Sequence, residues 1–183
     1  MGALQHFKTI TRHRHQVIRN CRRAGILWQG LRHDLSKYSP TEFREGARYW
    51  QGDRSPNDKA REENGYSAAW MHHKGRNRHH FEYWSDYSPV EKKVVPVEMP
   101  LRYVVEMFCD RVAASKIYQG KNYTDRHPLE YFERGRARRV MLIHPATSDL
   151  LERMLTKLAD EGEDSAFAYI RTLVREDKKN RKR

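Results

Sequence analysis

Hydrophobic residues recur along most of this chain at intervals of three and four positions, the spacing of one face of an α-helix. The first such stretch covers residues 3–24, and Gly25 is placed to end it as a C-cap. His13 lies four residues before Val17, so the two should share the inward face of this helix. The apolar positions that define the face are Leu4, Phe7, Ile10, Val17, Ile18 and Cys21.

Two helix signals follow. Apolar residues at positions 26, 27, 31 and 35 predict a short buried helix that carries His33 and Asp34. The next helix has a strong start signal, with Ser39 as its N-cap and Glu42 as the acid of a capping box. We expect this helix to run to about position 50 and to stop at Gly52.

The rest of the chain also has helical periodicity. Three prolines and a pair of lysines predict a mobile loop over residues 85–99. Asn77 is placed to cap a short helix that carries His79 and His80. Since the sequence has no convincing β alternation and no repeat, we expect an all-α fold, a single helical bundle with a metal site between helices. The remaining helices are expected from Ser55 to about Gly65, and at residues 66–73, 99–118, 128–137, 146–160 and 163–176.

Composition limits the class of protein. At 183 residues and 38% hydrophobic content the chain is long enough for one domain with a real core. No apolar run approaches eighteen residues, which predicts no membrane span. Cys21 and Cys109 do not make a disulfide framework, so reduced thiols and a cytoplasmic location are expected. We assign residues 1–176 to the domain and residues 177–183 to a basic, disordered tail.

The net charge of +12 favours polyanionic partners. Nucleotides, nucleic acid and phosphorylated metabolites all fit this charge, so it does not choose a substrate. The tail contributes +4 of the total and could bind nucleic acid or simply be solvated.

Residues 70–84, WMHHKGRNRHHFEYW, contain four of the ten histidines. These are His72 and His73, then His79 and His80. A solvated basic loop and a metal or catalytic site are equally good interpretations of this segment alone, because imidazole is the commonest metal-ligating side chain. Asp110 adds to the case, since an acid within an apolar helix is costly unless it is paired or bound to a cation.

Candidate ligands therefore come from four or five separate helices. Nitrogen and carboxylate donors without thiolates suit Mn, Fe, Co, Ni or Zn, and Mg is possible. One or two divalent ions could bind, and Asp34 beside His33 is the natural bridging carboxylate for two. The full set is His13, His33, Asp34, His72, His73, His79, His80 and Asp110.

The order His, His-Asp, histidines, Asp on an all-α chain resembles the HD-domain superfamily of metal-dependent phosphohydrolases. The segment HDLSK at residues 33–37 is similar to the superfamily's second motif, in which a lysine follows the aspartate by three positions. More closely, HDLSKYSPTEF, GYSAAWMHHKGRNRHHFEYW, and MPLRYVVEMFCDRVAASK with KNYTD resemble a widespread family of uncharacterised bacterial and phage proteins. The resemblance covers roughly residues 8–160.

The resemblance implies roles for particular residues. His13, His33, Asp34 and Asp110 match the ligands of the first metal, and the intervening histidines match extra ligands of dinuclear members, with His73 and His80 as first choices. Lys37 matches a position that contacts the substrate phosphate, and Arg111 is a possible phosphate clamp. Arg76 and Arg78 would attract an anionic substrate at the mouth of the site. The catalytic set is then Asp34, Lys37 and Arg111.

The resulting hypothesis is a phosphomonoesterase or phosphodiesterase that acts on a nucleotide or similar small phosphorylated compound. Two alternatives remain open. One is a diiron oxygenase on the same ligand set, and the other is a nucleic-acid-binding or regulatory module with a structural or vestigial metal site. The substrate, the metal, the ligating histidine of each pair and the oligomeric state are also open, and a dimer is plausible.

Overall fold

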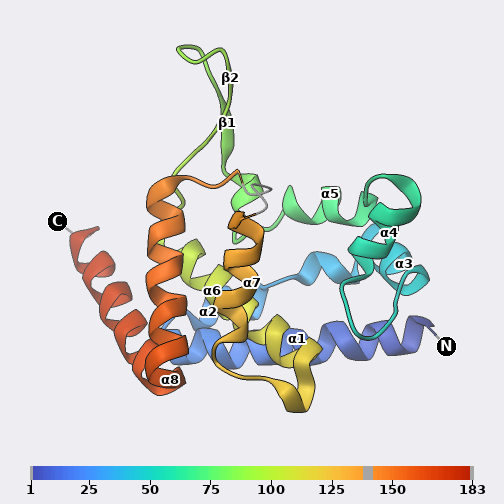
Figure 1. Cartoon of the computed structure of the whole chain (residues 1–183), viewed down its shortest axis with the longest axis horizontal. Coiled ribbons are helices and arrows are strands. Elements are labelled where there is room, and N and C mark those ends of the chain that lie inside the picture. Colours follow the sequence, from blue (N-terminus) through green and yellow to red (C-terminus); the bar gives the residue numbers. More distant parts are fainter. Residues whose placement is uncertain (1, 138–141, 182–183) are drawn as a thin grey trace.

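The chain folds mainly into α-helices, as Figure 1 shows. The computed structural model describes residues 2–137 and 142–181. The expected all-α class is confirmed, and several helix ends fall within one or two residues of their predicted positions. The elements are α1 (Gly2–Ala24), α2 (Leu27–Arg32), η1 (Leu35–Tyr38), α3 (Pro40–Arg48), α4 (Pro56–Asn64), α5 (Ala68–Lys74), η2 (Phe81–Tyr83), β1 (Ser85–Ser88), β2 (Lys93–Pro96), α6 (Leu101–Gln119), η3 (Gly120–Asn122), α7 (His127–Ala137) and α8 (Pro145–Asn180).

Helix α6 runs through the middle of the core and packs against both α1 and α8. Phe108 of α6 meets Phe167 of α8 edge to face, with ring centroids 5.7 Å apart, and both rings are fully buried. Asn20 of α1 donates a buried hydrogen bond of 3.0 Å to the Cys109 carbonyl oxygen of α6. This contact fixes the register of α1 against α6, and with it the positions of His13 and Asp110.

Helix α2 lies very close to α1. A Cβ atom built on Gly30 would lie 2.6 Å from the Cβ atom of Cys21, so only glycine fits this crossing. The predicted buried helix carrying His33 and Asp34 is wrong in two respects. Leu27 and Leu31 are exposed, and the helix ends at Arg32, before the two candidate ligands.

Residues 85–99 are not the loop that the prolines suggested. Strands β1 and β2 form an antiparallel hairpin with Ser85 opposite Pro96 and Ser88 opposite Lys93. The hairpin projects from the helical body (Figure 1). Its turn uses Lys92 at φ 52°, a left-handed conformation that closes the hairpin without a glycine.

Helix α8 differs from the prediction at its end. It continues to Asn180, so residues 177–180 are helical where a disordered tail was expected. An Asp177–Arg181 ion pair four residues apart stabilises this last turn. Gly162 kinks α8 at φ 81°, where the sequence placed a break between two helices. Among the residues described, none of the helices has the length and apolar character needed to cross a membrane.

Candidate metal centre

His33 and Asp34 lie at the joint between α2 and η1. Arg14 of α1 donates hydrogen bonds to the carbonyl oxygens of Leu31 and His33. These bonds satisfy carbonyl groups at the C-terminal end of α2. Asp34 then adopts a left-handed conformation, with φ 54° and ψ 26°. Aspartate tolerates this region better than most residues. Both side chains are buried, with 1% and 2% of their surface exposed.

The structure brings four predicted ligands together around this joint. His13 of α1, Asp110 of α6, His33 and Asp34 each offer one ligand atom within 4.8 Å of the others. His13 Nε2 lies 2.9 Å from Asp110 Oδ1, and His33 Nε2 lies 3.2 Å from Asp34 Oδ2. We call these residues the first group.

A second group shares Asp34 with the first and adds His73, His79 and His80. Asp34 Oδ1 lies 3.3 Å from His73 Nε2 and 3.5 Å from His79 Nε2. His72 is not part of this group, because its Nδ1 atom lies 2.6 Å from Glu42 Oε1 and its side chain is partly exposed. Asp34 is thus the residue that the two groups share.

The helix that Asn77 was expected to cap does not form there. Asn77 instead donates side-chain hydrogen bonds to the His73 carbonyl oxygen and to Ser36 Oγ. These contacts hold the turn between α5 and η2, and His79 and His80 lie in that turn rather than on a helix. The turn directs both histidines toward Asp34.

Two buried glutamates contact the Nδ1 atoms of the imidazole rings; the sequence reasoning did not assign Glu106 to the site and gave Glu42 such a role only second to capping. Glu106 Oε1 lies 2.9 Å from His33 Nδ1 and 3.3 Å from His79 Nδ1. Glu42 Oε2 lies 2.7 Å from His73 Nδ1. A carboxylate that accepts the Nδ1 proton leaves Nε2 free to bind a metal. Glu106 was visible as a second acid on the apolar helix, and Glu42 was interpreted first as a capping residue.

Six buried side-chain atoms at this centre make no hydrogen bond of good geometry within the described part of the chain, although Asp34 Oδ2 is ion-paired with Lys37 and His13 Nε2 lies close to Asp110. Unpaired buried polar atoms are rare and costly, so a cluster of them needs an explanation. All six atoms belong to the two groups, and every histidine atom among them is an Nε2. In His33 and His79 the Nε2 atom lies on the other side of the ring from the Nδ1 atom that contacts Glu106. A bound cation would satisfy them together. They are His13 Nε2, His33 Nε2, Asp34 Oδ1, Asp34 Oδ2, His79 Nε2 and His80 Nε2.

Residues 2–157 match the family described as Family of unknown function (DUF5662). The chain belongs to this family. No curated protein and no solved structure matches it. The matched span of this DUF5662 protein contains both groups and both orienting glutamates.

The carboxylates of the DUF5662 site are ionised. Burial alone would raise the pKa of Asp34, but His33, Lys37 and His73 outweigh it and hold that pKa well below its usual value. Burial acts the same way on Asp110, and contacts with His13 and His33 lower its pKa well below the usual value. The site therefore offers two negative charges to a cation at neutral pH.

The histidines fall into two classes. Burial would lower the pKa of His33, yet Asp34, Asp110 and Glu106 raise it well above its usual value. In contrast, burial and the nearby Lys37 lower the pKa of His13, and burial next to other histidines lowers that of His80. His13 and His80 are thus neutral and ready to donate a lone pair, whereas His33 must release a proton to do so.

The predicted substrate-binding cations occupy different surroundings. Lys37 Nζ lies 2.6 Å from Asp34 Oδ2, at the centre. Arg111 lies against the rings of Tyr131 and Phe132, with a buried Nε that has no hydrogen-bond partner. The two other predicted cations, Arg76 and Arg78, are exposed and donate to the His72 carbonyl oxygen and to the Tyr103 hydroxyl.

Proposed function

We propose that this DUF5662 protein is a metal-dependent phosphohydrolase of the HD-domain type, acting on a nucleotide or another small phosphorylated compound. The observation that carries the proposal is the position of Asp34, which is shared by two four-residue groups of mostly buried potential ligands, several of whose ligand atoms have no hydrogen-bond partner among the described residues. The order of these residues along the chain, with Lys37 three positions after Asp34, supports the same reaction class.

The donor set fits two ions. His13, His33, Asp34 and Asp110 would hold one, and Asp34 with His73, His79 and His80 would hold the other. Nitrogen and oxygen donors without thiolates favour first-row divalent ions over softer metals. Such ions supply Lewis acidity and lower the pKa of water toward neutrality.

The chain's own residues have separate tasks in this proposal. Asp34 stays ionised at neutral pH, and a water that it orients would help to take the proton from the attacking water. Lys37 carries its positive charge beside Asp34 and would bind a phosphoryl oxygen as negative charge develops there. Arg111 would have to leave the Tyr131 and Phe132 rings to supply a second cation for the same purpose.

The test combines metal analysis with a phosphate-release screen against nucleotides and generic phosphoesters. We expect a divalent metal in the purified protein and turnover of at least one substrate class. Asp34→Asn should retain the helical circular dichroism spectrum and lose both metal and activity, whereas Asp149→Asn, at an exposed position, should retain all three.

Two results would contradict the proposal. The first is a His33→Ala protein that keeps its metals and hydrolyses the substrate at the original rate. The second is an iron-loaded protein without phosphatase activity, whose ferric charge-transfer band responds to an added organic substrate. That spectrum would point to a diiron oxygenase instead.

A further inference from the structure

The outward face of α1 carries a line of four lysine or arginine side chains and one histidine, which we call the basic stripe. Its members follow one another at intervals of four and three residues, so they lie on one side of the helix. All of them are exposed, and no acid occurs in the sequence before Asp34. The stripe consists of Lys8, Arg12, His15, Arg19 and Arg22.

Two other arginines of α1 make contacts with neighbouring helices, whereas the lysine and arginines of the stripe make no ion pairs with any residue that the structure describes. Arg14 bonds to the end of α2, and Arg23 forms ion pairs with Glu163 and Asp164 of α8. Over residues 2–137 and 142–181, no ion pair joins an acid to a lysine or arginine of the stripe. These charges therefore face solvent without local neutralisation.

The stripe spans much of α1, and further basic residues of α8 lie near its C-terminal end. From Lys8 to Arg22 it rises about 21 Å, at about 1.5 Å per residue. At its far end Lys178 of α8 donates a 3.3 Å hydrogen bond to the Gly25 carbonyl oxygen. The basic last turns of α8 therefore lie beside the end of the stripe and lengthen the positive surface.

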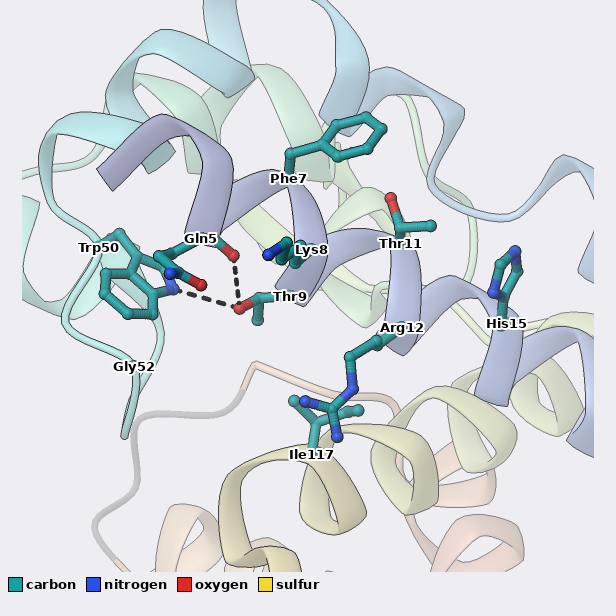
Figure 2. Close-up of a pocket in the computed structure, with 10 residues that line it drawn as sticks. All are labelled: Gln5, Phe7, Lys8, Thr9, Thr11, Arg12, His15, Trp50, Gly52 and Ile117. Carbon is teal, nitrogen blue, oxygen red and sulfur yellow. Dashed lines mark hydrogen bonds between the residues drawn. The ribbon is translucent and has the colours of Figure 1, made fainter. Parts of the chain in front are cut away.

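A cleft of about 500 Å³ opens beside the N-terminal half of the stripe (Figure 2). Lys8 and Arg12 line it together with the ring of Trp50. The Trp50 indole donates a 3.2 Å hydrogen bond to Thr9 Oγ1, and Gln5 adds an amide to the same wall. The cleft thus combines an aromatic ring, polar groups and positive charge.

We infer that the basic stripe binds the backbone of a single-stranded nucleic acid and that the cleft receives one of its bases. A one-sided line of cations matches a phosphate chain, and an aromatic ring in a small cleft offers a stacking surface to an unpaired base. A membrane surface fits less well, because an interfacial helix inserts its apolar face. Ile10 and Val17 of the apolar face of α1 are buried in the core, whereas Leu4 and Phe7, which the sequence placed on the same inward face, are exposed near its N-terminal end.

This inference does not depend on the proposed phosphohydrolase activity. The stripe lies on the side of α1 opposite His13, and backbone binding needs no metal. Binding can therefore be measured in the presence of a chelator, where hydrolysis of the probe is excluded. Failure of either proposal leaves the other standing.

The test measures fluorescence anisotropy of labelled 20-nucleotide oligo-dT and oligo-U, with a duplex of the same length for comparison. Arg12→Gln/Arg19→Gln/Arg22→Gln removes three charges from the stripe. The matched control, Lys93→Gln/Lys121→Gln/Arg134→Gln, removes three exposed charges elsewhere. We expect the stripe variant to bind at least about tenfold more weakly and its salt slope to fall by about 2, at about 0.7 per phosphate contact. The control should stay within about twofold of the unmodified protein.

Trp50 tests the cleft separately. Trp50→Leu should weaken binding about tenfold at an unchanged salt slope, because it removes a stacking surface and no charge. Trp50→Phe keeps a ring and should keep most of the affinity. Three results would overturn the inference: equal losses in the two triple variants, tighter binding to the duplex than to single strands, or binding to anionic lipid vesicles without binding to either oligonucleotide.

Discussion

Glu106 contacts one histidine of each group, His33 and His79. Its replacement therefore tests whether buried glutamates orient the histidines of the centre. In Glu106→Gln the side chain keeps its size and loses its charge. The carboxylate contacts His33 Nδ1 and His79 Nδ1, and its other oxygen accepts a 2.6 Å hydrogen bond from the Gln29 amide. A neutral amide cannot accept all three protons. We therefore expect both stability and metal affinity to fall.

The size of the stability loss follows from the pKa of Glu106. Burial would raise that pKa, but His33 and His79 lower it from 4.5 to about 2. The side chain is 7% exposed, so water screens these contacts little. A gap of this size corresponds to about 3 kcal/mol of folding free energy at pH 7. The same substitution should weaken metal binding by about 10- to 100-fold, the usual cost of removing a group that orients a ligand.

The assay is urea unfolding of metal-free protein at several pH values, with Glu133→Gln as an exposed control. A carboxylate with a lowered pKa stabilises the fold fully above its unfolded pKa of 4.5, and this stabilisation is lost as the pH falls toward about 2. The difference between wild type and Glu106→Gln should thus shrink to about half by pH 3. A difference that is absent at pH 7, or that does not change with pH, would refute the reasoning.

Three other predictions address the site and the fold. If the protein holds two ions, Glu42→Gln should lower the metal content toward one, because Glu42 orients His73 of the second group only. Elemental analysis measures the content, and loss of both ions would contradict this prediction. Affinity for the ion of the first group should rise by about tenfold per pH unit between pH 6 and 8 in chelator competition, since the raised pKa of His33 means that binding displaces its proton. A flat profile would argue against His33 as a ligand. Gly30→Ala should lower the free energy of unfolding by about 1–3 kcal/mol, because the added Cβ atom clashes with α1. In the control Gly75→Ala the added Cβ atom makes only an ordinary contact at 3.5 Å, so the free energy of unfolding should hardly change. Thermal and urea unfolding compare the two variants.

The sequence predicted the helices where local signals and burial agree. Helix α1 ends beside Gly25, and the Ser39 hydroxyl caps α3, because glycine and serine act through short-range backbone geometry. The hairpin was missed because its strands are short and lack a buried face, so they show no alternation. The last turn of α8 contains an ion pair, and tail composition alone did not indicate that this turn would be helical.

The candidate site was predictable to a similar extent. His13 and Asp110 were conspicuous as polar residues on apolar helix faces, whereas Asp34 was chosen as the carboxylate beside His33 and from the family resemblance. The choice among neighbouring histidines was not available from periodicity, since the turn held by Asn77 presents both His79 and His80. The role of Glu42 was hidden for another reason: its position also satisfies a capping pattern, and only tertiary packing brings His73 to it.

The left-handed backbone at Asp34 restricts which amino acids can occupy the shared position. A β-branched residue there would be strained by about 1–3 kcal/mol, and glutamate would place its carboxylate one methylene farther from the joint. Asparagine tolerates the same backbone and keeps the same length, so it changes the chemistry while leaving the turn intact. The backbone and the chemistry therefore select for the same short acid, and a search for variants at this position should recover folded proteins with Asn and Gly more often than with Val, Ile or Thr.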